Sequence, residues 1–268
     1  MIKEDIDMSK LNFNKKLVIG MVHCLPLPGT VNYKDNMPQI IDQAVQDAVT
    51  LERAGADAII IENMGDEPFN IKLDNIQVAA LASISTIVSE KVATPIGIDA
   101  GMNDYETALS IAKVINADFV RIPVFVDTVE FYGGIIEPCA REAMLYRKRI
   151  GAENVKIFAD IHAKHTHMLL PTVSIEDSAS AAIGCGANAI IVTGTHTGKE
   201  TPMEIIKKVK ALSSIPVIVG SGVKKNNIKE QLEIADGAII GSSLKVDGII
   251  TNPVSYELTR EIIEKLNN

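Results

Sequence analysis

Three ionisable residues alternate along one apolar run of the chain. Asp160, His162 and Lys164 lie within the run Val155–Lys164, and apolar residues separate them. Residues two apart in an extended strand share a face, so the three side chains are predicted to point the same way. Charged groups on a buried strand are costly unless they are paired or functional. The pattern predicts an acid, a base and an electrophile at one site, and the alternative is a salt-bridge network that closes the base of the fold.

Two glycine-serine sequences follow apolar runs in the last fifth of the chain. Glycines let backbone N–H groups approach an anion closely, hydroxyls add donors, and a helix N-terminus adds positive potential. We therefore predict a phosphate site at these two turns, bordered by a third turn. The predicted phosphate-binding residues are Gly194, Thr195, Gly220, Ser221, Gly222, Gly241, Ser242 and Ser243. The alternative is a pair of ordinary tight turns between a strand and a helix.

Four more polar residues lie in or at the end of other apolar runs. They are His23, Glu62, Asp99 and Arg121. Any one of them alone is more often a satisfied structural residue than a catalytic one. Together with the first three, they would place carboxylates, an arginine and two histidines around one opening. We predict all seven as the catalytic set.

This set of residues permits several kinds of chemistry. Carboxylates with a histidine can remove and return a proton on a phosphosugar. Lys164 can form a Schiff base if neighbouring cations lower its pKa. A divalent metal is the possible cofactor, with His23, Asp99, Asp160 and His162 as its ligands, although no HxxxH spacing is present. The chain has no Walker loop, no dinucleotide-binding fingerprint and no GxSxG sequence.

The predicted strands are eight short, β-rich runs bounded by Gly, Pro, Asn or Asp. Their Ile, Val, Ala and Leu content is typical of parallel strands that are buried on both faces. The runs are Leu17–His23, Ala58–Met64, Pro95–Gly101, Phe119–Phe125, Val155–Lys164, Ala189–Gly194, Pro216–Gly222 and Gly237–Leu244.

Segments with helical periodicity separate and follow these runs. They are Met37–Ala54, Leu73–Lys91, Tyr105–Asn116, Pro138–Ile150, Ile175–Cys185, Met203–Leu212, Lys224–Ile234 and Val254–Leu266. Thr201 and Asn252, each followed by proline, are predicted to cap two of them. Eight strand-helix units without a linker predict a single (β/α)8 TIM barrel over residues 1–268. In such barrels the active site lies at the C-terminal ends of the strands, and phosphate binds after strands seven and eight.

Composition narrows the classes of partner and location. The net charge of −8 argues against a nucleic-acid partner, which needs clustered Lys and Arg. Three widely spaced cysteines and a charged N-terminus without an apolar signal sequence predict a cytoplasmic protein. No apolar run reaches the roughly 18 residues of a transmembrane helix. Barrels of this size commonly assemble, so we expect a homo-oligomer that binds a small phosphorylated ligand.

Several of these motifs resemble blocks of the BtpA/SgcQ family. The opening block is Val18–His23 followed by Leu25–Gly29, and the fifth-strand block is Phe158–His165. Later blocks are Gly220–Val223 and Gly241–Lys245, and the resemblance runs from about residue 17 to residue 260. It implies a TIM barrel of the ribulose-phosphate-binding type.

The resemblance does not bring a settled reaction, so two functions stay open. The family is linked in cyanobacteria to the accumulation of photosystem I, yet other members occur in organisms without a photosystem. One prediction is an enzyme that acts on a sugar phosphate or nucleotide-like compound, as an isomerase, epimerase, lyase or hydrolase. The alternative is a non-catalytic assembly or stability factor of the kind linked to photosystem I biogenesis.

Overall fold

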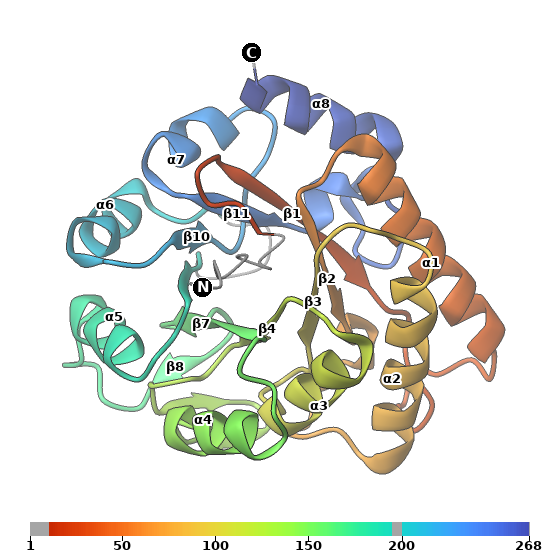
Figure 1. Ribbon diagram of the computed structural model, residues 1–268, viewed down its shortest axis with the longest axis horizontal. Coiled ribbons are helices and arrows are strands. Elements are labelled where there is room, and N and C mark those ends of the chain that lie inside the picture. The colour runs from red at the N-terminus through yellow and green to blue at the C-terminus, as the bar shows by residue number, and fades with distance from the viewer. Residues whose placement is uncertain (1–10, 195–199, 268) are drawn as a thin grey trace, which may run out of the picture.

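The chain folds into a closed barrel of eight parallel strands, in the order β1-β11-β10-β9-β7-β4-β3-β2 (Figure 1). The computed structural model describes residues 11–194 and 200–267. The barrel strands are β1 (Leu17–His23), β2 (Ala58–Glu62), β3 (Ile96–Asp99), β4 (Phe119–Ile122), β7 (Lys156–Ile161), β9 (Ala189–Val192), β10 (Val217–Val219) and β11 (Gly237–Ile240). The barrel closes where Leu17 of β1 pairs with Gly237 of β11.

Helices surround the barrel, and one helix follows each barrel strand (Figure 1). They are α1 (Met37–Ala54), α2 (Asn75–Ser89), α3 (Tyr105–Ile115), α4 (Ala140–Arg149), α5 (Ile175–Gly184), α6 (Met203–Leu212), α7 (Ile228–Ile234) and α8 (Tyr256–Asn267). Short extra strands lie between β4 and α4 and between β7 and α5. Three short 3₁₀ turns lie in the loops that follow β2 and β11. They are η1 (Met64–Asp66), η2 (Ser242–Leu244) and η3 (Val246–Gly248). The predicted (β/α)8 barrel is confirmed.

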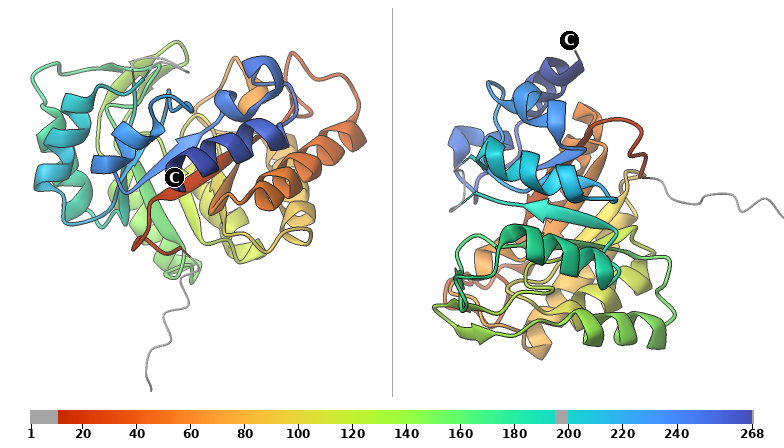
Figure 2. Two further views of the ribbon diagram at one scale, coloured as in Figure 1. Left: turned by 90° about the horizontal axis from the view of Figure 1, so that it is seen from above. Right: turned by 90° about the vertical axis from the view of Figure 1, so that its left-hand side faces the viewer.

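A small antiparallel sheet extends the loops that follow β4 and β7. It consists of β5 (Val129–Phe131), β6 (Gly134–Ile136) and β8 (His167–Met168), in the order β6-β5-β8. Its inner face packs on residues that follow β2 and β3, including Phe69 and Met102. In the right-hand view of Figure 2, β5 and β6 (light green) lie at the opposite end of the barrel from the segment before β1 (red). This sheet was not predicted from the sequence.

The barrel interior is apolar at the end where the strands begin. Leu17, Ile19, Phe119 and Phe158 fill this part, and the rings of Phe119 and Phe158 stack with centroids 4.4 Å apart. Leu11 packs into the same cluster from the segment before β1. Because alternate residues of each strand point inward, the next inward positions lie at the other end of the barrel, and on β2, β3, β4 and β7 these positions are charged.

Two predicted helix caps are wrong. Helix α6 begins at Met203 without a side-chain cap, and Thr201 instead donates its hydroxyl to the carbonyl of Ser221 (3.5 Å). The C-terminal helix begins later than expected, and its cap is Ser255, whose Oγ accepts the N–H of Leu258 (3.2 Å). Asn252 donates to a carbonyl of η3 instead. In both cases the side chain predicted to cap the helix instead donates a hydrogen bond to a backbone carbonyl.

Candidate functional site

The C-terminal end of the barrel interior holds a layer of charged side chains. His23, Glu62 and Asp99 end β1, β2 and β3 and lie side by side in the strand register. Arg121 comes from β4 and Asp160 from β7. His23, Asp99, Arg121 and Asp160 are all buried. The sequence-based expectation that these five strand positions face one opening agrees with this geometry.

Arg121 is the centre of this layer. Its Nε donates to one oxygen of Asp160 (2.9 Å) and its Nη2 to the other (2.8 Å), which is a two-point contact. Its Nη1 lies 3.3 Å from an oxygen of Asp99. Burial lowers the pKa of Arg121, but the charges of Asp160, Asp99 and Glu62 outweigh burial and raise that pKa. The guanidinium therefore stays charged, and Asp160 is fully occupied in holding it.

Asp99 differs from Asp160 although both face the same arginine. Within the described residues, neither oxygen of Asp99 accepts a hydrogen bond, because its contact with Arg121 lacks the required geometry. Burial raises the pKa of Asp99 well above its usual value, and the charge of Glu62 adds to this, while Arg121 opposes it. The raised pKa favours the neutral form of Asp99, which can donate a proton or a hydrogen bond.

His23 and Glu62 form a second pair, with His23 Nε2 3.4 Å from an oxygen of Glu62. Burial lowers the pKa of His23, and the charges of Lys245 and Lys164 support this, although Glu62 opposes it. Burial alone would raise the pKa of Glu62, but His23, Arg121 and Lys164 hold it at about 2. Glu62 is therefore ionised, and the lowered pKa of His23 favours the neutral imidazole, which can act as a base.

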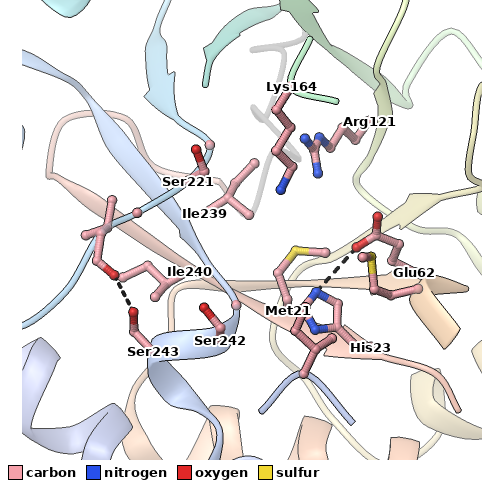
Figure 3. Close-up of a pocket in the computed structure, with 16 residues that line it drawn as sticks. Met21, His23, Glu62, Arg121, Lys164, Ser221, Ile239, Ile240, Ser242 and Ser243 are labelled. Carbon is pink, nitrogen blue, oxygen red and sulfur yellow. Dashed lines mark hydrogen bonds and ion pairs between the residues drawn. The ribbon is translucent and has the colours of Figure 1, made fainter. Parts of the chain in front are cut away.

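Lys164 lies beyond the end of β7, and its amine extends toward Arg121 and the interior of the pocket (Figure 3). Its backbone N–H donates to the hydroxyl of Thr193 (3.1 Å), which fixes the start of the side chain. Burial lowers the pKa of Lys164, and the positive charge of Arg121 lowers it further, while the nearby carboxylates oppose this. An amine in this environment can lose its proton more readily than a surface lysine.

The glycine-serine turns after β10 and β11 form the opposite wall (Figure 3). Ser221 Oγ accepts the N–H of Gly194 (2.8 Å), and Ser243 Oγ donates to the carbonyl of Val223 (2.7 Å). A Cβ at Gly241 would lie 2.8 Å from Cε1 of His23. The glycine therefore lets the turn lie directly against the imidazole.

A buried ion pair supports the turn after β11 from outside the barrel. The amine of Lys245 contacts Asp47 of α1, and both side chains are almost completely buried. The second oxygen of Asp47 accepts the N–H of Val254 (2.7 Å). Because Lys245 directly follows η2, this pair joins the turn that lines the pocket to α1 and to the loop before α8.

One pocket of about 40 Å³ brings most of the predicted site residues together. The predicted residues that line it are His23, Glu62, Arg121, Lys164, Gly220, Ser221, Gly222, Gly241, Ser242 and Ser243. Asp99 and Asp160 contact Arg121, and Gly194 donates to Ser221, so these three support the lining. Thr195 lies outside the described residues.

The alternation of the sequence predicted that His162 would share one face with Asp160 and Lys164, but His162 does not line the pocket. Strand β7 ends at Ile161, and the backbone of His162 turns into the left-handed region with φ 46°. Its N–H donates to Asp127 (2.8 Å). The expectation of one shared face depended on an extended backbone through Lys164, and this turn removes it.

The predicted metal site is not supported by the geometry of the described residues. Within them, no three His, Cys, Asp or Glu side chains come together in a way that could hold a metal ion. Of the four predicted ligands, Asp160 is occupied by Arg121, and His162 has turned away from the pocket.

The apolar residues of the pocket and the ion pair between Lys245 and Asp47 were not predicted from the sequence. Met21, Met64, Val223, Ile239, Ile240 and Ile250 also line the pocket. Met21 could have been found, because it lies two residues before His23 on the same inward face. Lys245 carried a signal as well, since a lysine directly after an apolar run requires a partner when buried.

The fold and the site together define a TIM barrel whose C-terminal opening has one ionisable wall and one glycine-serine wall. The chain belongs to the BtpA family, whose model matches residues 14–268. It is 41% identical to an uncharacterised protein of Methanocaldococcus jannaschii over 256 residues, covering 95% of this chain and 97% of that one. It is 35% identical to the photosystem I biogenesis protein BtpA of a Synechocystis species, covering 93% and 87%.

Solved structures of other barrels share the fold at low sequence identity. Tryptophan synthase from M. tuberculosis matches with a TM-score of 0.63 and 15% identity, covering 96% of this chain and 95% of that one. Thiamine phosphate pyrophosphorylase from Pyrococcus furiosus matches with a TM-score of 0.58 and 16% identity, covering 97% and 96%. In the described part of this chain, no helix is long and apolar enough to cross a membrane.

Proposed function

We propose that this protein is an enzyme that acts on a small phosphorylated metabolite by acid-base chemistry. The observation that carries the proposal is the pairing of two walls across one pocket. Glycine-serine turns from β10 and β11 lie on one side, and ionisable side chains from β1, β2, β4 and the end of β7 on the other. A phosphate on the first side would hold the rest of the substrate against the second side.

The first step of the proposal is phosphate binding at the glycine-serine wall. Gly220, Gly222 and Gly241 have no side chain to block the approach of an anion to the backbone, and the serine hydroxyls add donors. Lys164 and Arg121 also line the pocket, where Glu62 and the Asp160 that pairs with Arg121 offset part of their positive charge. The thiamine phosphate pyrophosphorylase and phosphoribosyl anthranilate isomerase that share the fold are named for phosphorylated compounds, which agrees with the proposal.

The second step is proton transfer at the ionisable wall. The lowered pKa of His23 favours its neutral form, which can accept a proton from a substrate carbon next to a carbonyl group. Glu62, ionised 3.4 Å away, would stabilise the imidazolium that forms. Lys164 would donate a proton to the carbonyl oxygen, which gives an enol or enediol. Return of the carbon-bound proton to the former carbonyl carbon completes an isomerisation, and its return to the opposite face of the same carbon completes an epimerisation. In both cases Lys164 takes a proton back from a hydroxyl of the intermediate. An amine with a lowered pKa also permits a Schiff base with the same carbonyl, which would make the enzyme a lyase.

Thermal shift and calorimetry with a panel of phosphosugars test the proposal. A ligand at 100 times its Kd adds about 2.7 kcal/mol to the free energy of unfolding, which raises Tm by several degrees. Ser221→Asp should abolish this gain, because it puts a negative charge in the pocket. Ser180→Asp, on the exposed surface of α5, is the matched control and should keep the gain. If no phosphosugar stabilises the protein, the proposal is wrong.

The second candidate function is a non-catalytic assembly factor. The observation that favours it is the 35% identity to the photosystem I biogenesis protein of Synechocystis. Its test is expression of this chain in a cyanobacterium that lacks its own BtpA protein. If the chain restores photosystem I and the double variant His23→Gln, Lys164→Met restores it equally, the assembly factor is favoured. If only the unmodified chain restores it, the ionisable wall is required and the enzyme is favoured.

A further inference from the structure

A larger groove adjoins the pocket on its outer side. It has a volume of about 790 Å³, and Met64 and Ile250 line both the pocket and the groove. Its walls come from the loop between β1 and α1, the first turns of α1, the segment around η1 and the loop between η3 and α8. The two spaces are therefore direct neighbours, with Met64 and Ile250 at their common border.

The volumes of the pocket and the groove indicate which part of a ligand each space can hold. One water-sized group occupies about 10–15 Å³ on this measure of volume. The inner pocket of about 40 Å³ thus holds about three such groups, which is enough for a phosphate and little more. The groove is about twenty times larger and has the size of a binding site for a drug-sized molecule. Most of the substrate must lie in the groove.

The groove offers neutral hydrogen-bonding groups above an apolar base. Asn32, Asn36, Gln39 and Gln43 contribute carboxamides, while Leu25, Pro26 and Ile40 are among the apolar residues. One lysine and one glutamate also line it, so their charges cancel. A second phosphate would find no excess positive charge there, and a plain alkyl chain would leave the carboxamides without partners.

Two of the carboxamides use their NH₂ groups in hydrogen bonds to the backbone, so their oxygens are left as acceptors for a ligand. The NH₂ group of Asn32 donates to the carbonyl of Glu67 (2.9 Å), and that of Gln43 donates to the carbonyl of Thr251 (3.0 Å). Within the described residues, the side-chain oxygens of Asn32 and Gln43 accept no hydrogen bond from the protein. Such acceptors fit a planar group with exocyclic amines or ring N–H donors on its edge and apolar faces. A nucleobase has both properties.

We infer that the groove binds the base of a nucleoside 5′-monophosphate whose phosphate lies at the glycine-serine wall. The inference rests on the proposed function, because it uses the same phosphate position. It adds that the substrate class is a nucleotide rather than a simple sugar phosphate. The ribose would then lie between the two spaces, near Met64 and Ile250, with C1′ toward the ionisable wall. A nucleotide ribose has no carbonyl group, so the matching acid-base reaction is hydrolysis of the bond between C1′ and the base. His23 would take a proton from water, the water oxygen would bond to C1′ as the C1′–N bond breaks, and Lys164 would protonate the base that leaves.

Calorimetry with three kinds of probe tests the inference. The probes are inorganic phosphate, ribose 5-phosphate and the four common nucleoside 5′-monophosphates. At least one nucleotide should bind ten times more tightly than ribose 5-phosphate. The double variant Gln39→Ala, Gln43→Ala should remove this advantage and leave the affinity for ribose 5-phosphate unchanged. Gln46→Ala, an exposed glutamine of α1 outside the groove, is the control and should bind every probe as the unmodified protein does.

The outcomes separate this inference from the proposed function. If ribose 5-phosphate binds and no nucleotide binds more tightly, the groove does not hold a base, although the phosphate site stands. The same conclusion follows if the double variant keeps the full nucleotide advantage. If neither phosphate nor any phosphorylated probe binds, the proposed function itself is wrong. Alanine favours a helix, so both variants should fold, and thermal unfolding checks this.

Discussion

Two aspartates that face one arginine have opposite properties at the candidate site. Asp160 accepts two hydrogen bonds from Arg121, whereas neither oxygen of Asp99 accepts any from the described residues. Burial dominates at Asp99 and favours its neutral form. A buried carboxyl without hydrogen bonds destabilises a fold unless another benefit offsets the cost. Such a residue is a better candidate for chemistry than its well-paired neighbour.

Replacing each aspartate by the uncharged asparagine should change the free energy of unfolding in opposite directions. The raised pKa of Asp99 means that its contribution to stability is present below its unfolded pKa and is lost as pH rises toward its folded pKa. Asp99→Asn removes this loss, so it should raise the free energy of unfolding by about 1–3 kcal/mol at pH 7, and less at pH 4. Asp160→Asn breaks the contact with Arg121 and should cost about 3–5 kcal/mol. Urea unfolding at pH 4, 5.5 and 7 measures both. Equal destabilisation by the two variants at pH 7 would contradict the raised pKa of Asp99.

The barrel strands were predictable because their sequences are consistent with the fold at every level. The run Leu17–His23 is β1 as predicted, because seven buried positions in a row fit a strand covered on both faces. Most later strands were predicted too long at the C-terminal end. Val155–Lys164 shows the reason, since His162 leaves the strand with a positive φ that no apolar pattern signals.

The small sheet was missed although one signal for it was present. Strand β5 has an alternating pattern, and Tyr132 and Gly133 form a two-residue connection to β6. Strands of two or three residues are too short for periodicity to identify, and β8 comes from a loop more than 30 residues later. The glycine-serine wall was predictable because glycine has no side chain, so a glycine at a turn indicates close approach of the backbone from the local sequence alone. The occupied state of Asp160 was not, because it depends on contacts between separate strands.

Gly241, at the end of β11, lets the glycine-serine wall lie close to the ionisable wall. In Gly241→Ala the new Cβ would lie 2.8 Å from the ring of His23, so the imidazole or the turn must move. We expect at least a tenfold loss of affinity for a phosphorylated ligand, measured by calorimetry. Gly184→Ala is the matched control, because no atom lies within 4 Å of its new Cβ. If both variants bind equally well, the close approach at Gly241 has no role in binding.

The apolar cluster and the charged pocket lie at opposite ends of the barrel axis. The interior is apolar where the strands begin, and the segment before β1 packs on it through Leu11 and Phe13. The charged layer and the pocket lie at the opposite end, where barrels of this architecture carry their active sites. A cytoplasmic location and a homo-oligomeric state stay predictions, since both depend on features outside one chain.

Changes at the apolar end should therefore alter stability and leave binding unchanged. Leu11 is 5% exposed, and its side chain fills the barrel interior next to Leu17 and the Phe119–Phe158 pair. Leu11→Ala should cost about 2–5 kcal/mol of unfolding free energy, because it removes buried apolar contacts and leaves a cavity. Leu258→Ala, at an exposed position on α8, should cost much less. Urea unfolding measures the loss, and calorimetry at a temperature where each variant is fully folded should give the same Kd for the phosphorylated ligand. A weaker affinity in Leu11→Ala alone would mean that the two ends of the barrel are coupled, because the apolar layer would then transmit its packing to the charged layer above it.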